Sequence, residues 1–108
     1  MELKLVEAFE IEDRKVARYE IGSYQVKALT YSWGDRVEVR GTNKERYLPD
    51  IYCRTDDEGE IVGFEVQTTS YGALPVDEVK KVVEGLNEAI AVVEILTDRF
   101  VNKTEGRG

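Results

Sequence analysis

Few residues of this sequence belong to the types that commonly perform catalysis. Histidine is absent, which removes the commonest general base, the commonest metal ligand, and the Ser-His and Cys-His nucleophile arrangements. The one cysteine, Cys53, lies in a predicted strand, where its ordinary role is that of a small buried hydrophobic side chain. No phosphate-binding loop, dinucleotide fingerprint, paired-cysteine zinc site or nucleophile elbow occurs. The sequence therefore predicts a protein that is not an enzyme and that uses no cofactor or metal.

The densest group of charged side chains is the acidic run Asp56–Glu60. Neighbouring carboxylates can hold a calcium ion, but this run lacks the alternating ligands, spread over about twelve residues, of a helix-loop-helix calcium site. Acidic residues around Gly59 are instead typical of a hairpin turn with solvated carboxylates. We interpret the run as such a turn. Acid–base chemistry by carboxylates alone stays open, although the sequence does not identify a pair.

The residues around Trp33 are the best candidate binding site on the predicted strands. Trp33 and Gly34 are expected at a hairpin tip, and tryptophan is a preferred anchor at protein interfaces. Tyr31, Arg36 and Arg40 flank the same hairpin, and aromatic and cationic side chains of this kind can orient a small ligand such as a nucleotide. Strands are also rich in aromatic residues for packing reasons alone. The sequence therefore predicts a protein contact at Trp33, with ligand binding by the other three residues as the alternative.

The elements that position these residues begin with a strand-rich part. From Glu2 to Thr69, apolar and polar residues alternate in short runs, a pattern typical of half-buried strands. Turn residues such as Gly22-Ser23, Gly34 and the acidic run separate these stretches. Because the connections are short, neighbouring strands are expected to be antiparallel. Residues 1–69 are therefore predicted to form an antiparallel meander of about five to six strands.

Residues 75–102 are predicted to form one long amphipathic helix. Pro75 suits the first turn, and Asp77 and Glu78 complement the positive end of the helix dipole. Residues 103–108 are expected to fray. We predict a single α+β domain, residues 1–108, in which the helix packs on the sheet through one apolar stripe. The residues of that stripe follow one another at intervals of three, four or seven positions: Val79, Val83, Leu86, Ile90, Val93 and Phe100. Val82, Ala89 and Leu96 widen the stripe into a core-facing surface.

Three apolar residues of this helix fall outside the stripe. The stripe centres near Leu86 and Val93, so Ile95 falls almost opposite it, and Ala91 and Val92 fall beyond its edges. Ala91, Val92 and Ile95 are therefore predicted to form an interface with a second copy of the chain or with another protein. Two alternatives stay open. Another segment of the chain covers these residues, or they are scattered exposed side chains that need no partner.

The chain carries a formal net charge of −7. This surplus of acidic residues argues against direct binding to nucleic acid or to an anionic membrane, because both need a surplus of Lys and Arg. It permits a basic protein as the partner. The sequence contains no apolar stretch long enough to span a membrane, no signal-peptide pattern at its N-terminus and no second cysteine for an internal disulfide. These features predict a cytoplasmic protein.

The segment from Val66 to Gly72, followed by the residues from Pro75 to Leu96, resembles the C-terminal part of small proteins encoded by phages and prophages of Gram-positive bacteria. The resemblance covers roughly the last third of the chain and includes no catalytic motif. It implies a small accessory protein that binds a host factor in the host cytoplasm. Inhibitors of bacterial immune systems are often small and acidic in this way, but the resemblance assigns no functional residue.

These observations favour a non-enzymatic, acidic protein-binding module that forms a homodimer and inhibits a host protein, for example one of the immune system. One alternative is a domain that binds a small ligand or nucleotide in a pocket between sheet and helix. The other alternative is a structural or assembly protein of a particle.

Overall fold

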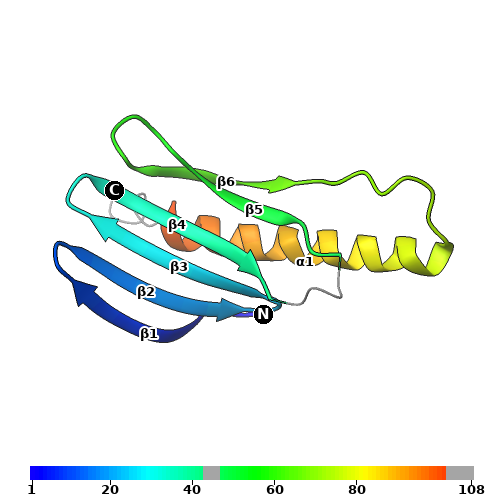
Figure 1. The fold of residues 1–108 in the computed structure, drawn as a ribbon, viewed down its shortest axis with the longest axis horizontal. Helices are drawn as coiled ribbons and strands as arrows, with labels where there is room; N and C mark the ends of the chain where they lie inside the picture. The colour runs from blue at the N-terminus through cyan, green and yellow to red at the C-terminus, as the bar shows by residue number, and fades with distance from the viewer. Residues whose placement is uncertain (43–46, 102–108) are drawn as a thin grey trace.

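The computed structural model of this chain describes residues 1–42 and 47–101. These residues form an antiparallel meander followed by a long C-terminal helix that packs on it (Figure 1), so the predicted α+β fold is confirmed. The elements within them are β1 (Lys4–Ile11), β2 (Arg14–Ile21), β3 (Tyr24–Tyr31), β4 (Gly34–Gly41), β5 (Asp50–Thr55), β6 (Ile61–Gln67) and α1 (Val76–Phe100).

The first four strands form one continuous sheet in the order β1-β2-β3-β4. Each strand pairs antiparallel with the next, and the register places Tyr19, Val26 and Val39 beside one another on β2, β3 and β4. Because side chains alternate between the two faces of a sheet, this register collects apolar residues on the face that α1 covers. Glu12 and Gly22 shape two of the tight turns, with φ angles of 55° and 53°.

The last two strands form a separate hairpin instead of extending that sheet to six strands. β5 and β6 pair with each other, whereas β4 and β5 share no ladder within the described part of the chain. The amide of Asp35 donates a hydrogen bond of 2.9 Å to the carbonyl of Gly59, which joins the hairpin turn to the tip of the sheet. The backbones meet so closely here that a Cβ on Gly34 would lie 2.6 Å from the Gly59 oxygen.

The acidic run forms the turn of the β5–β6 hairpin, as predicted. The carboxylate of Asp56 accepts hydrogen bonds of 2.9 Å from the backbone amides of Glu58 and Glu60, so it closes the turn. Gly59 has a φ of 80°, a conformation that favours glycine. No group of three or more possible ligands is placed to hold a metal ion within residues 1–42 and 47–101.

The hydrophobic core lies between α1, one face of the four-stranded sheet and the β5–β6 hairpin. Tyr24 is completely buried there, and its hydroxyl donates a hydrogen bond of 2.6 Å to the carbonyl of Pro49, which ties the start of β5 to the sheet. The buried residues of this core are Ile21, Tyr24, Val26, Val37, Ile51, Ala89, Val92 and Leu96.

The helix is rotated relative to the predicted orientation. It buries Gly85, Ala89, Val92 and Leu96, of which Ala89 and Leu96 were predicted to face the core. By contrast, the predicted core residues Val79, Val83 and Ile90 are 45%, 48% and 50% exposed. The prediction that Val92 lies outside the core is wrong, because its exposure is 0%. The physical reason is the close approach at Gly85, where the missing side chain lets the Tyr47 carbonyl contact the helix and turns this face inward.

The N-terminal half of α1 extends beyond the end of the sheet, together with the connection that follows β6 (Figure 1). The molecule is accordingly elongated, with extents of 49 × 27 × 22 Å. The predicted frayed segment, residues 103–108, lies outside the described residues. No helix in the described part of the chain is long and apolar enough to cross a membrane.

Candidate protein-interaction surfaces

A continuous apolar stripe of α1 faces solvent. Val76 is 70% exposed, and Val79, Val83 and Ile90 are each about half exposed. Leu86 and Val93 are half-buried and lie along the edge of the stripe nearest to the core. We call these residues the outer stripe: Val76, Val79, Val83, Leu86, Ile90 and Val93.

The outer stripe lies on the side of α1 that points away from the sheet. Val83 and Val92 are nine residues apart, which at about 100° per residue places them on opposite sides of the helix. Because Val92 is buried in the core, Val83 points to solvent. The helix therefore has two apolar faces, and the described part of the chain covers only one of them.

Contacts along α1 fix which face points outward. In its middle, the carboxylate of Glu88 accepts a hydrogen bond of 2.5 Å from the amide of Ser23 in the β2–β3 turn. At its end, the ring of Phe100 packs edge-on against Tyr19, with centroids 6.1 Å apart. Together with the backbone contact at Gly85, these contacts hold the helix against both the sheet and the segment before β5.

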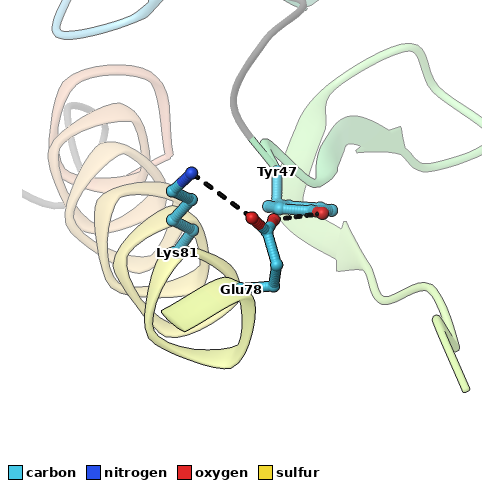
Figure 2. Close-up of polar contacts among 3 residues, drawn as sticks. All are labelled: Tyr47, Glu78 and Lys81. Atoms are coloured by element: carbon cyan, nitrogen blue, oxygen red, sulfur yellow. Dashed lines mark hydrogen bonds and ion pairs between the residues drawn. The ribbon is translucent and has the colours of Figure 1, made fainter. Parts of the chain in front are cut away.

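The first turn of α1 is held by a polar contact outside the sheet. The hydroxyl of Tyr47 donates a hydrogen bond of 2.6 Å to Oε2 of Glu78, and Nζ of Lys81 lies 3.4 Å from Oε1 of the same carboxylate (Figure 2). Tyr71 packs edge-on against Tyr47, with ring centroids 5.0 Å apart. The Tyr47–Glu78–Lys81 contact therefore positions the part of α1 that extends beyond the sheet.

The shared hydrogen bond shifts the pKa values of both partners. Donation by the Tyr47 hydroxyl stabilises the charged carboxylate and lowers the pKa of Glu78 below its ordinary value. The same bond raises the pKa of Tyr47, because ionisation removes the proton that the hydroxyl donates and places a negative charge beside the carboxylate. The contact is therefore intact at neutral pH, where Glu78 is charged and Tyr47 is neutral.

Trp33 forms a second exposed apolar surface, at the β3–β4 turn. Its side chain is 64% exposed and stacks on Tyr31, with ring centroids 4.6 Å apart and planes inclined by 10°. This stack holds the indole in one orientation before any partner binds, which reduces the entropy lost on association. The place of Trp33 at a hairpin tip is as predicted, and its exposure suits an interface anchor.

The predicted ligand residues Tyr31, Arg36 and Arg40 project from one face of the sheet but border different hollows. Arg36 borders a hollow of about 450 Å³ together with Trp33. Arg40 borders one of about 610 Å³ beside Lys27. Tyr31 borders a third, of about 380 Å³. The structure therefore does not bring these three predicted residues together around one cavity.

The predicted interface residues of α1 are placed differently from the outer stripe. Val92 belongs to the core, and Ala91 and Ile95 are half-buried. Ile95 borders a hollow of about 480 Å³ with Leu5 and Tyr19, beside the first two strands. Sequence reasoning missed Val76 and assigned Val79, Val83 and Ile90, which face solvent, to the core. Its assignment of Val93 to the core holds in part, because Val93 is half-buried and packs against the core cluster. The available signal was the small pair Gly85 and Ala89, four residues apart, which marks the face of closest packing.

Cys53 has no features of a reactive thiol. Its side chain is half-buried in β5, and burial raises the pKa of the thiol. A thiol with a raised pKa is protonated at neutral pH and is a poor nucleophile.

Comparison of the chain with protein-family models, with curated proteins and with solved structures gives no match. The outer stripe and Trp33 are therefore the surfaces for which a function can be proposed.

Proposed function

We propose that this protein is a non-enzymatic protein-binding module that binds its partner through the outer stripe of α1. The observation that carries the proposal is the exposure of Val76, Val79, Val83 and Ile90 along one side of a 25-residue helix. Apolar rows of this kind on a helix are the usual anchors of helix-in-groove and helix–helix recognition. Polar residues flank the row on the edge farther from the core, as they do at the rim of protein interfaces.

Covering the outer stripe contributes part of the energy that binding needs, and the apolar surface of the partner must supply the rest. Burying the exposed half of a valine or isoleucine side chain contributes about 1 kcal/mol. The four most exposed residues together contribute about 4 kcal/mol before the costs of association are subtracted. Contacts from the half-buried Leu86 and Val93 add to this figure. Trp33 supplies a separate anchor for a larger partner, at the tip of the β3–β4 hairpin.

The charge of the chain and the resemblance of its C-terminal third narrow the proposal. For a partner other than a second copy of the chain, a net charge of −7 favours a basic protein over an acidic one. Occupying a host protein and thereby inhibiting it is the use that the resemblance to phage-encoded proteins suggests.

Site-specific photo-crosslinking in the cells that naturally contain the protein tests this function. A photoreactive residue at position 83 or 90 is expected to give a defined crosslinked product, and Val79→Glu in the same chain is expected to abolish it. The matched control is the same photoreactive residue at position 62, because Val62 is 51% exposed on β6, away from the outer stripe. Equal crosslinking at positions 62, 83 and 90, or none at 83 and 90, would contradict the proposal.

A further inference from the structure

We infer that the occupant of the outer stripe is a second copy of this chain, bound through α1 in an antiparallel two-fold pair. The inference rests on the proposed function, because it names the partner for the same surface. It is carried by the spacing of the outer stripe and by the charges beside it.

The outer stripe has the spacing of a coiled-coil seam. From Val76 to Val93 its residues follow one another at alternating intervals of three and four, which is a heptad repeat of period 3.5. One of the two seam positions holds Val76, Val83 and Ile90, and the other holds Val79, Leu86 and Val93. A helix that only packs on a sheet needs no second face with a heptad spacing. The buried face of α1, from Gly85 to Leu96, already fills that role.

The charges beside the outer stripe are complementary to themselves in the antiparallel orientation. Lys80, Asn87 and Glu94 are all exposed and occupy the same heptad position, along the edge of the stripe farthest from the core. Lys80 and Glu94 lie seven residues before and after Asn87. In an antiparallel pair, residues at this position face one another across the seam. A pair centred beside Asn87 therefore places Lys80 of each copy against Glu94 of the other, which gives two ion pairs.

The same register also brings the apolar residues of the two outer stripes into contact. It sets Leu86 of one copy against Ile90 of the other, and Val83 of one copy against Val93 of the other. In a parallel pair, by contrast, Lys80 and Glu94 of one copy would face the other flank of the partner's seam. That flank would then have to supply charges opposite to theirs. That flank holds the apolar residues Val82, Ala89 and Leu96, of which Ala89 and Leu96 are buried in the core. The charge pattern therefore selects the antiparallel orientation.

The first experiment measures the oligomeric state of the full purified chain by light scattering after size exclusion, across a dilution series. The native chain is expected to be a dimer that dissociates on dilution. Ile90→Glu is expected to be a monomer with an unchanged circular dichroism spectrum, because Ile90 is already half exposed. The matched control Val62→Glu places the same charge on a residue of similar exposure and should remain a dimer. A native chain that is monomeric throughout the series overturns the inference.

A charge swap tests the orientation. Lys80→Glu and Glu94→Lys are each expected to weaken the dimer by about threefold to tenfold, because each replaces two attractions with two repulsions. The double variant Lys80→Glu/Glu94→Lys is expected to restore the native affinity. Lys4→Glu, on β1, makes the same charge change away from the stripe and should have no effect. Failure of the double variant to recover overturns the antiparallel pairing.

The two proposals fail in different ways. A monomeric native chain that still crosslinks to another protein from positions 83 and 90 overturns the self-association and leaves the protein-binding function standing. A dimer whose only crosslinked product is a second copy supports both. A monomer without any specific crosslink overturns both.

Discussion

Replacing Gly85 by alanine should destabilise the protein, although the same change in an exposed helix would stabilise it. A Cβ at this position would overlap the carbonyl oxygen of Tyr47, and it would lie 2.8 Å from the Tyr47 carbonyl carbon and 3.7 Å from the Leu48 nitrogen. These are backbone atoms, so relief of the overlap requires the segment before β5 to move away from α1. Overpacking of this kind costs up to about 3 kcal/mol.

The gain in helix propensity from glycine to alanine offsets only about 1 kcal/mol of that cost. We therefore expect Gly85→Ala to lower the free energy of unfolding by about 2 kcal/mol and the Tm by about 8–16 °C. The control is Gly63→Ala, because a Cβ at Gly63 would meet nothing within 4 Å. Its Tm should be unchanged or slightly raised.

Thermal and urea unfolding, followed by circular dichroism, measure both variants. If Gly85→Ala instead raises the stability by about 1 kcal/mol, the helix does not approach Tyr47 at this residue. The assigned rotation of α1, and with it the outward direction of the outer stripe, would then be wrong.

Further expected outcomes follow from the same contacts. Val92→Ala should cost about 2 kcal/mol, whereas Val83→Ala should change the unfolding free energy by less than about 0.5 kcal/mol; urea denaturation distinguishes the buried from the exposed face. Because the pKa of Glu78 is lowered in the folded state, its hydrogen bond stabilises the fold above the ordinary glutamate pKa and is lost as pH falls through the folded value. The stability difference between the native chain and Tyr47→Phe should therefore shrink below about pH 4.5 in acid titrations, and a constant difference would contradict the contact. Trp33→Ala should lower the unfolding free energy by at most about 1 kcal/mol, since it removes one exposed ring stack; a larger loss in the same assay would mean that the indole supports the fold.

The strands and turns could be predicted because their causes are local. The turn residues Gly22-Ser23 marked the boundary between β2 and β3, and the acidic run around Gly59 marked the turn between β5 and β6. The start of α1 followed from Pro75 and the acidic residues after it. Trp33 was found for the same reason, since a hairpin tip is specified by its own residues and leaves its side chains in solvent.

The division of the strands into a sheet of four and a hairpin of two could not be predicted. It depends on how β4 and the β5–β6 hairpin meet, through Gly34 and Gly59, which lie far apart in the sequence. The ligand residues Tyr31, Arg36 and Arg40 were expected to act together because they are close in sequence. Their positions along β3 and β4 instead distribute them among separate hollows.

The sequence by itself determined that the C-terminal segment is a helix with apolar residues at three- and four-residue spacing. It did not determine which of two apolar faces packs on the sheet, because both faces satisfy that spacing. The tertiary structure decided this through Gly85, whose missing side chain allows the Tyr47 backbone to approach and turns Ala89, Val92 and Leu96 inward. When two backbones approach closely, more atoms come into van der Waals contact than when bulkier apolar side chains hold the helix farther from its neighbour. The outer stripe, which has the more regular heptad spacing, therefore faces solvent. It forms the surface that we propose binds a second copy of the chain.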